Sequence, residues 1–399
     1  MQTGFIRRRQ ALTIDGISGT GLPIPFLAFG ADWLRMPAET IPPMLTVETK
    51  TPDTSASSEP SGKAPPDWRG IVEPVEPFLQ SVAGRLVEQV EDFDPEIAEY
   101  AHYALANQGK QLRPALVSLS ASAAGGVREE HVTLAVIIEM VHLATLVHDD
   151  VMDEAEMRRK RPTLAVNWGR HVSVLLGDCL FAHALKLAAS YPTPEICRAV
   201  ASAAKTVCSG EILQTHRRLK FDMTRAEYFK MLAMKTAEFF ALSCDLGAHL
   251  SGAGEPEREA LRRYGMALGT AYQIYDDCLD LFGSEDVVGK SLGADLAGGK
   301  LTLPAIVTLE RANDADLGEL REVIENWRPE HLERALRLFE RYDALKETKA
   351  AIARYLTEAR DALSEISQGN GRDALHQLTD FLEWQSVHVG RAAGVYNGR

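Results

Sequence analysis

Apolar side chains recur every three or four positions through most of the chain, from about residue 68 to residue 388. This spacing places them on one face of an α-helix and predicts helices almost throughout that segment. Pro and Gly gather at breaks such as SYPTPE and SGAGEPE, where helices are expected to end. We find no alternating strand patterns joined by hairpin turns. The pattern predicts an all-α fold, built as one large helical bundle.

The first 67 residues have a different composition. Residues 51–68, TPDTSASSEPSGKAPPDW, are rich in Ser, Thr, Pro and acidic residues, which bury too little apolar surface to offset the entropy of ordering. The start, MQTGFIRRRQ, lacks the apolar core of a secretory signal. We expect residues 1–67 to be a disordered extension, either a targeting peptide or an overlong gene start with Met44 as the initiator. Residues 68–390 are the expected folded domain, and residues 391–399 a tail.

Composition limits what this domain can bind. The formal net charge of -13 argues against a general surface for nucleic acids or anionic membranes, so an anionic substrate requires local basic residues or bound cations. The most apolar run, residues 132–147, contains Glu139 and His142 and is too short for a transmembrane span. Five cysteines without CxxC spacing are expected to be reduced, which is typical of a cytoplasmic protein.

The first candidate site lies in HLATLVHDDVMDEAEMRRKRPT, residues 142–163, where a long apolar helix ends in acidic and basic residues. Asp149 and Asp153 share one helix face because they are four residues apart, and Asp150 lies beside them. Their like charges weaken a bare helix, and a divalent cation such as Mg²⁺ would relieve the repulsion. A solvated helix end has the same pattern, so this motif alone leaves both interpretations open.

A second acidic cluster, YQIYDDCLD, ends another apolar helix later in the chain. Gln273, Asp277 and Asp280 follow the helical spacing i, i+4, i+7, and Asp276 lies beside them. Two such helices that face each other across a bundle would form a cavity with acidic walls. These walls would repel each other unless cations and anions filled the space between them. Two apolar helices seldom both end in DDxxD by chance, so the pair favours a metal site.

Basic residues that can hold an anion accompany both clusters. They are Lys110 and Arg113 in GKQLRP, Arg158, Arg159, Lys160 and Arg161 in RRKRPT, and Lys290 and Lys300 in GKSLGADLAGGKLTLP. Lys290 and Lys300 each follow a glycine, which lets backbone N–H groups approach a ligand closely. Lys235 and Thr236 occur in a helix that is otherwise apolar. Together with the aspartates, these residues describe a cavity for Mg²⁺ and a polyphosphate.

Seven motifs, in order, resemble those of all-trans polyprenyl diphosphate synthases, which elongate isoprenoid chains head to tail: GKQLRP, VHLATLVHDDVMDEAEMRR, GDCLFAHA, GEILQ, KTAEFF, YQIYDDCLDLFG and GKSLGADLAGGKLTLP. The resemblance spans residues 75–388. It implies an all-α bundle of the isoprenoid synthase type around a deep cavity, usually a homodimer, with residues 68–390 as the catalytic domain. It also implies that isopentenyl diphosphate is condensed with dimethylallyl, geranyl, farnesyl or geranylgeranyl diphosphate, with three Mg²⁺ ions per active site and Mn²⁺ as a substitute.

The resemblance also implies a role for each motif residue. Asp149, Asp153 and Asp276 would bind Mg²⁺, supported by Asp150, Asp277 and Asp280. Lys110, Arg113, His142 and Arg159 would hold isopentenyl diphosphate, while Arg158, Lys235 and Lys300, with Lys290 nearby, would hold the allylic diphosphate. Thr236 and Gln273 would direct oxygens at the allylic carbocation. Where the family has glycine after the arginine pair this chain has Lys160, so a difference in local loop shape is expected.

Product length is predicted from the helix turn before the first aspartate, where Ala144 and Thr145 would meet the growing chain. These positions tend to be aromatic in short-chain members, whereas here both are small and DDVMD carries no insertion. We therefore expect a product of C25 or longer, with C30–C50 favoured and a short-chain C15 or C20 synthase as the alternative.

Three other functions compete with this interpretation. A class I terpene cyclase shares the fold and the first motif but has a different second metal motif. A non-catalytic subunit usually has decayed motifs, and none is decayed here. A metal phosphohydrolase, suggested by His148 in front of the aspartates, would need further histidines and would leave the other motifs without a role.

Overall fold

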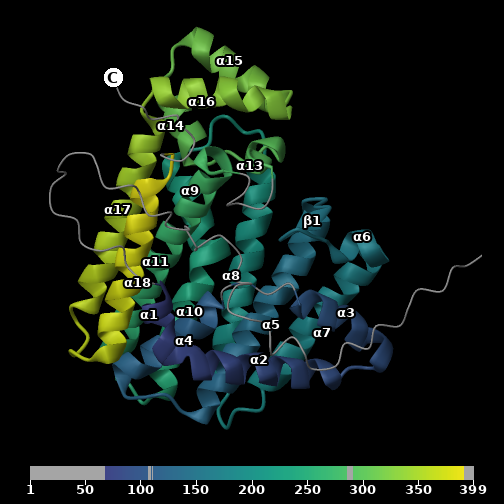
Figure 1. Ribbon diagram of the computed structural model, residues 1–399, viewed down its shortest axis with the longest axis vertical. Coiled ribbons are helices and arrows are strands. Elements are labelled where there is room, and N and C mark those ends of the chain that lie inside the picture. Colours follow the sequence, from purple (N-terminus) through teal and green to yellow (C-terminus); the bar gives the residue numbers. More distant parts are fainter. Residues whose placement is uncertain (1–67, 107–108, 110, 285–290, 391–399) are drawn as a thin grey trace, which may run out of the picture. The chain divides into compact units, whose positions relative to one another are not determined.

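The computed structural model describes residues 68–106, 109, 111–284 and 291–390, which are almost entirely helical (Figure 1). The elements up to the middle of the chain are α1 (Trp68–Val72), η3 (Glu73–Val75), α2 (Glu76–Glu91), α3 (Pro95–Leu105), α4 (Leu112–Ala124), α5 (Glu129–Met152), β1 (Met157–Arg158), β2 (Arg161–Pro162), α6 (Leu164–Trp168), α7 (Arg170–Ala188) and α8 (Glu195–Arg217). They are followed by α9 (Arg225–Leu232), η4 (Ala233–Ala237), α10 (Glu238–Leu250), α11 (Glu255–Phe282), α13 (Ala294–Ala297), α14 (Leu303–Arg311), α15 (Asp314–Glu325), η5 (Pro329–His331), α16 (Leu332–Arg341), α17 (Ala344–Leu363) and α18 (Asn370–His388).

This architecture confirms the predicted all-α fold. Several predictions concern parts of the chain for which no structure is described. The expected disordered extension, residues 1–67, and the tail, residues 391–399, lie outside the described residues, as do the candidate anion-binding residues Lys110 and Lys290.

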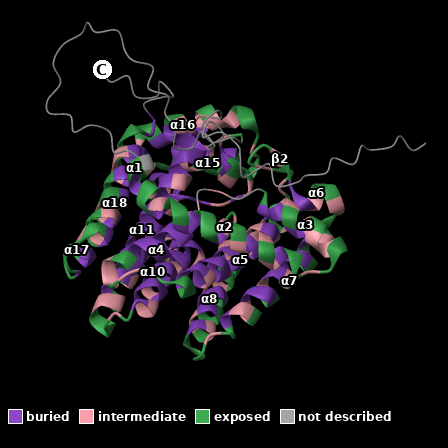
Figure 2. Cartoon of the chain, turned by 60° about the horizontal axis from the view of Figure 1, so that its bottom comes forward, coloured by how far each residue is buried: buried purple, intermediate pink, exposed green. Residues whose placement is uncertain are grey.

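Helices α10 and α11 pack against each other at the centre, with α4 against α10 and α17 against α11. These helices carry many of the buried residues drawn purple in Figure 2, and Phe239 and Phe240 on α10 are fully buried. Gly265 on α11 permits the close approach. A Cβ atom there would lie 2.5 Å from the carbonyl oxygen of Phe240 and 2.8 Å from the Cα of Ala241. At this point of contact α11 has no side chain, so the backbones of α10 and α11 pack directly against each other.

Two described helices, α5 and α7, are long and apolar enough to cross a membrane by length and composition alone. The apolar window of α5 is 72% buried inside the protein, as expected for the core helix that the sequence predicted. The window of α7 is only 39% buried, and Leu175 on it is 64% exposed. Helix α7 thus leaves an apolar face uncovered in this single chain.

A short hairpin departs from the purely helical expectation. Strands β1 and β2 pair antiparallel, with Met157 opposite Pro162. The two residues between them, Arg159 and Lys160, have φ angles of 50° and 62°, the left-handed region that favours glycine. Tight hairpins of this kind need positive φ at both central positions, which gives a physical reason for the family's glycine where this chain has Lys160. The pattern did not predict strands this short.

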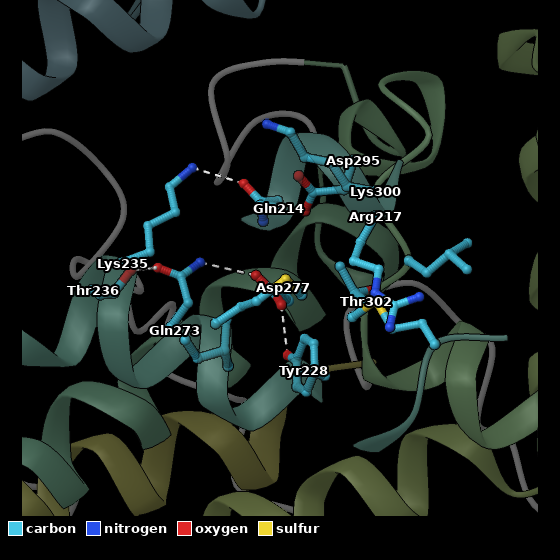
Figure 3. A pocket seen from close by; sticks show the side chains of 14 residues that line it. Gln214, Arg217, Tyr228, Lys235, Thr236, Gln273, Asp277, Asp295, Lys300 and Thr302 are labelled. Atoms are coloured by element: carbon cyan, nitrogen blue, oxygen red, sulfur yellow. Dashed lines mark hydrogen bonds between the residues drawn. The ribbon is translucent and has the colours of Figure 1, made fainter. Parts of the chain in front are cut away.

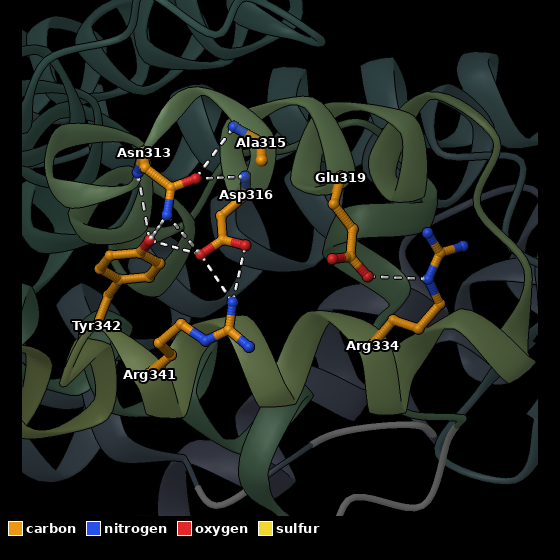
Figure 4. Close-up of polar contacts among 7 residues, drawn as sticks. All are labelled: Asn313, Ala315, Asp316, Glu319, Arg334, Arg341 and Tyr342. Atoms are coloured by element: carbon orange, nitrogen blue, oxygen red, sulfur yellow. Dashed lines mark hydrogen bonds and ion pairs between the residues drawn. The ribbon is translucent and has the colours of Figure 1, made fainter.

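Helices α15 and α16 form a helical hairpin that is held by polar contacts (Figure 4). Asp316 accepts hydrogen bonds from Arg341 Nη1 at 2.8 Å and from Tyr342 Oη at 2.6 Å. Asn313 caps α15 by accepting from the backbone N–H groups of Ala315 and Asp316, both at 3.0 Å. These polar groups are hydrogen-bonded to one another within the hairpin, so we assign them a structural role.

Candidate active site

An open pocket lies among α8, α9, η4, α11, α13 and the segment that follows α13 (Figure 3). Its polar lining consists of Gln214, Arg217, Tyr228, Lys235, Thr236, Gln273, Asp277, Asp295, Lys300 and Thr302. Five of these residues, from three separate motifs, were sequence candidates: Lys235, Thr236, Gln273, Asp277 and Lys300. The fold thus gathers chemistry that is scattered along the chain.

Lys235 and Thr236 lie in η4, a π-helical turn between α9 and α10. Such turns inside helices are frequent at functional sites. Gly210 on α8 lets that helix approach the turn, since a Cβ atom there would lie 2.9 Å from the Lys235 backbone nitrogen. Glu211 forms an ion pair with Lys235, whose Nζ also donates to Gln214 Oε1 at 2.8 Å. Both partners belong to GEILQ, to which the sequence analysis assigned no chemical role.

Hydrogen bonds connect the pocket wall to the second acidic motif (Figure 3). Thr236 Oγ1 donates to Gln273 Oε1 at 2.9 Å, and Gln273 Nε2 donates to Asp277 Oδ1 at 2.9 Å. Tyr228 Oη donates to Asp277 Oδ2 at 2.6 Å. Burial, and next the charge of Asp295, raise the pKa of Asp277 well above its usual value, while both hydrogen bonds oppose the rise. The side chains of Thr236 and Gln273 are therefore anchored through a buried carboxyl group.

Asp280 ties the end of α11 to the segment that carries Lys300. Its side chain is 2% exposed, and its Oδ2 accepts from the backbone N–H of Asp295 at 3.0 Å. Its carbonyl oxygen accepts from the Gly293 N–H at 2.7 Å. Asp276 is only partly buried, so of the three aspartates in this motif it is the one most open to a ligand. These positions fit the supporting roles expected for Asp277 and Asp280.

Asp149, in the first motif, is a partly buried residue whose carboxyl group has a raised pKa. Burial raises its pKa to about 6, and the charges of Glu211 and Asp153 add to the rise. Lys235 and Arg158 oppose it. For Lys235, burial lowers the pKa, but the charges of Asp149 and Glu211 outweigh that effect and leave it raised. Asp149 therefore lies within electrostatic reach of Lys235, and an added cation would stabilise the charged form of Asp149.

The other two aspartates of the first motif already have cationic partners. Asp150 is buried and accepts from Arg158 Nε at 2.7 Å. Asp153, which caps α5, accepts from Arg218 Nη2 at 2.6 Å and from Lys300 Nζ at 2.7 Å. The Lys300 contact brings the segment after α13 to the first acidic motif, and the hydrogen bond from Asp295 to Asp280 ties that region to the second motif. Arg218 was not among the predicted site residues.

A second basic region surrounds His142. Burial, and then the charges of Arg113, Arg159 and Arg158, lower the pKa of His142 well below its usual value, so the imidazole is neutral. Burial also raises the pKa of Glu139, against the opposing charges of Arg113 and Arg159. Glu139 faces the charges of Arg113 and Arg159, and Asp150 faces those of Arg158 and Arg159. Three guanidinium groups thus meet two carboxyl groups here, which suits the region to an anion. The sequence analysis had noted Glu139 only as a polar residue within an apolar run.

The remaining predicted residues lie on or near α5. Ala144 is 2% exposed, and Thr145 Oγ1 donates to the His142 carbonyl oxygen at 2.7 Å. His148 Nε2 lies 3.0 Å from the Val174 carbonyl oxygen on α7, so this histidine links two helices. That contact explains His148 without the metal role which a phosphohydrolase would require.

The carboxylates of the two acidic motifs are the candidate metal ligands among the described residues. Among the described residues, no three His, Cys, Asp or Glu side chains are close enough together to hold a metal ion unaided. Mg²⁺ usually takes one or two protein carboxylates and completes its shell with water and substrate phosphates. The all-oxygen set of Asp149, Asp153 and Asp276, with its raised Asp149 pKa, fits such a shared ion.

Comparison with known proteins agrees with this geometry. The family model for polyprenyl synthetase matches residues 94–342. The chain belongs to the polyprenyl synthetase family. It is 33% identical over 303 residues to the short chain isoprenyl diphosphate synthase of Methanothermobacter thermautotrophicus, covering 75% of this chain and 93% of that protein. It is 33% identical over 302 residues to heptaprenyl diphosphate synthase component 2 of Bacillus subtilis, covering 75% and 86%.

A solved structure extends the match to three dimensions. The decaprenyl diphosphate synthase of Rhodobacter capsulatus superposes with a TM-score of 0.75 at 32% identity, covering 79% of this chain and 98% of that one. This polyprenyl synthetase is therefore an all-trans polyprenyl diphosphate synthase, a prenyltransferase with isoprenoid diphosphate substrates. Its family uses a divalent metal to ionise the diphosphate. The resemblance, the enzyme class and the fold predicted from the motifs are confirmed.

Proposed function

We propose that this enzyme condenses isopentenyl diphosphate with an allylic diphosphate, assisted by three Mg²⁺ ions or by Mn²⁺, and releases a polyprenyl diphosphate of C25 or longer. The contact between Asp153 and Lys300 supports this most directly, because it brings the first acidic motif to the basic segment that Asp280 of the second motif also contacts. Residues 68–390 would form the catalytic domain, in keeping with the family match over residues 94–342.

The allylic diphosphate would be bound between the acidic motifs by Lys235, Lys300 and Arg158. Asp149, Asp153 and Asp276 would hold the metal ions, which neutralise charge on the leaving diphosphate when bound. Lys235 remains an ammonium group because its pKa is raised. It therefore stabilises the negative charge that grows on the diphosphate as the C–O bond breaks, more than it stabilises the intact substrate.

Isopentenyl diphosphate would bind in the basic region around Arg113, Arg159 and His142, together with Lys110. The neutral His142 can donate one hydrogen bond without adding a charge that burial disfavours. The double bond of isopentenyl diphosphate then attacks the allylic carbocation, which faces the oxygens of Thr236 and Gln273. A C–C bond forms, and one proton leaves to the released diphosphate.

Product length would be decided along α5, away from the aspartates. Ala144 is small and buried, so residue 144 places no aromatic side chain in the path of the growing tail. The relatives named above make short-chain, heptaprenyl and decaprenyl products within one family, so the family by itself leaves the length open. The small residues at 144 and 145 support the longer class.

We further propose that the enzyme acts as a homodimer in the cytoplasm. The exposed apolar side chains of α7 and α8, such as Leu175 and Ile212, would be covered by a second copy. Cys179, Cys197, Cys208, Cys244 and Cys278 are free in the structure, consistent with a reducing compartment.

Purified enzyme supplied with farnesyl diphosphate, isopentenyl diphosphate and Mg²⁺ tests the proposal, with product chains sized by mass spectrometry. We expect products of C25 or longer and no turnover with a chelator. Asp149→Ala and Asp276→Ala should each lower turnover by at least about 10² while helicity is kept. Near-normal turnover in either variant would contradict the assigned metal site. Termination at C15 or C20 would contradict the length, and product without isopentenyl diphosphate would indicate a cyclase.

A further inference from the structure

Arg218 donates a hydrogen bond to one carboxylate oxygen of Asp153, a proposed metal ligand. Its Nη2 donates to Asp153 Oδ1 at 2.6 Å, and Lys300 Nζ donates to Asp153 Oδ2 at 2.7 Å. Each oxygen of the Asp153 carboxylate is therefore paired with a cationic side chain. The Arg218 side chain is 27% exposed, and its Nε is buried with no hydrogen-bond partner among the described residues. The guanidinium thus has unused donor capacity next to the cavity.

The loop between α8 and α9, residues 218–224, is attached to the Lys300 segment. Leu219 N–H donates to the Gly299 carbonyl oxygen at 2.8 Å, and a Cβ atom on Gly299 would lie 2.9 Å from Leu219 Cγ. Leu219 itself has a φ of 57°, a strained value for a leucine. The two arginines that precede Leu219 point to different partners. Arg217 pairs with Glu227 at the start of α9, whereas Arg218 points to Asp153.

A metal ion and these two cations compete for the same carboxylate oxygens. A divalent ion that binds Asp153 would repel both cations, and a partly buried guanidinium that leaves the carboxylate needs a new anion. The allylic diphosphate that accompanies the metal supplies this anion in the same cavity. Guanidinium suits the exchange because it can pair with two phosphate oxygens at once.

We propose that Arg218 is an exchange residue, which holds Asp153 in the empty enzyme and moves to the allylic diphosphate when metal takes Asp153. The inference rests on the proposed role of Asp153 as a metal ligand. It has a measurable consequence. Arg218 weakens the binding of metal alone and strengthens the binding of diphosphate with metal, so that the two ligands enter together.

The test compares Arg218→Gln with Lys220→Gln, which removes the same charge from an exposed position of the same loop. Binding of Mn²⁺ alone to the substrate-free enzyme is followed by electron paramagnetic resonance. Binding of inorganic diphosphate at saturating Mg²⁺ is followed by calorimetry. For Arg218→Gln we expect Mn²⁺ to bind several-fold tighter and diphosphate about tenfold weaker. The KM for isopentenyl diphosphate should not change, and Lys220→Gln should match the wild type in all three.

Two further variants separate the possible failures. Arg218→Lys keeps the charge without the planar fork, so it should retain wild-type Mn²⁺ affinity and bind diphosphate with intermediate strength. Unchanged or weaker Mn²⁺ binding in a folded Arg218→Gln enzyme, or unchanged diphosphate binding, overturns the exchange role. If Arg218→Gln does not fold, Arg218→Lys decides alone, and diphosphate binding equal to the wild type overturns the proposal. Mn²⁺ binding that survives Asp153→Asn instead refutes Asp153 as a ligand, which is the underlying proposed function.

Discussion

Tyr228 on α9 donates its hydroxyl to Asp277 Oδ2 on α11 at 2.6 Å, in the buried wall behind the active-site pocket. The same carboxyl group accepts from Gln273, which in turn accepts from Thr236. Tyr228, which belongs to none of the seven motifs, thus anchors the two side chains that we propose face the carbocation. Near-attack geometry is sensitive to displacements of this kind, so we expect the hydroxyl to matter for turnover.

Tyr228→Phe should lower kcat about tenfold, because it removes a hydrogen bond to a buried carboxyl group without changing the shape of the ring. Steady-state kinetics at saturating substrates and metal measure the effect. Tyr191→Phe is the matched control, since its hydroxyl donates to the Glu130 carbonyl oxygen at 2.6 Å at the other end of α5. That variant should keep wild-type kcat. Equal losses in both variants would show that the effect is one of stability.

Arg113→Ala should raise the KM for isopentenyl diphosphate by tenfold or more and the KM for the allylic substrate much less. The reason is that Arg113 belongs to the basic region around His142, whereas Lys235 lies in the pocket with Thr236 and Gln273. Lys235→Ala should show the opposite selectivity, and Lys110→Ala should resemble Arg113→Ala. If one variant changed the KM values of both substrates equally, its residue would have been assigned to the wrong pocket.

Ala144→Phe should shorten the product, because a phenyl ring at this buried position would close the path of the growing tail. Products from farnesyl diphosphate and excess isopentenyl diphosphate are sized by mass spectrometry. Val387→Phe is the control. Val387 is an exposed residue of α18, outside the proposed path along α5, and this variant should leave the length unchanged. A long product from Ala144→Phe would show that residue 144 does not line the tunnel.

His131→Gln should reduce the loss of stability at acid pH. Burial lowers the pKa of His131, although backbone hydrogen bonds to Gly247 and Arg128 oppose the shift. The unfolded chain therefore takes up the proton first, and the stability contributed by this group, present above about pH 6.5, is lost as pH falls toward the folded pKa. Urea unfolding at pH 7.5 and pH 5.5 measures how much the free energy of unfolding falls between the two pH values. The control is His216→Gln, at an exposed position. An unchanged difference in His131→Gln would exclude this histidine as a source of acid sensitivity.

The sequence by itself determined the helical class and the residue types of the site. Helical periodicity is a local property, since apolar positions three and four apart face the same side whatever the rest of the chain does. The DDxxD pairs are local in the same sense, which is why Asp149, Asp153 and Asp276 could be named without a structure. The β1–β2 hairpin was missed because two residues are too few to show strand alternation.

Tertiary structure decided which of these residues meet. Asp153 and Lys300 are 147 residues apart in the chain, and no local pattern encodes their contact. Tyr228, Arg218 and Glu139 take their roles from partners on other helices, and each looks ordinary in its own segment. The pKa of Asp149 likewise depends on burial and on charges from α8 and η4. Spacing along a helix reports only the direction of a side chain, whereas burial and pairing depend on how the helices pack.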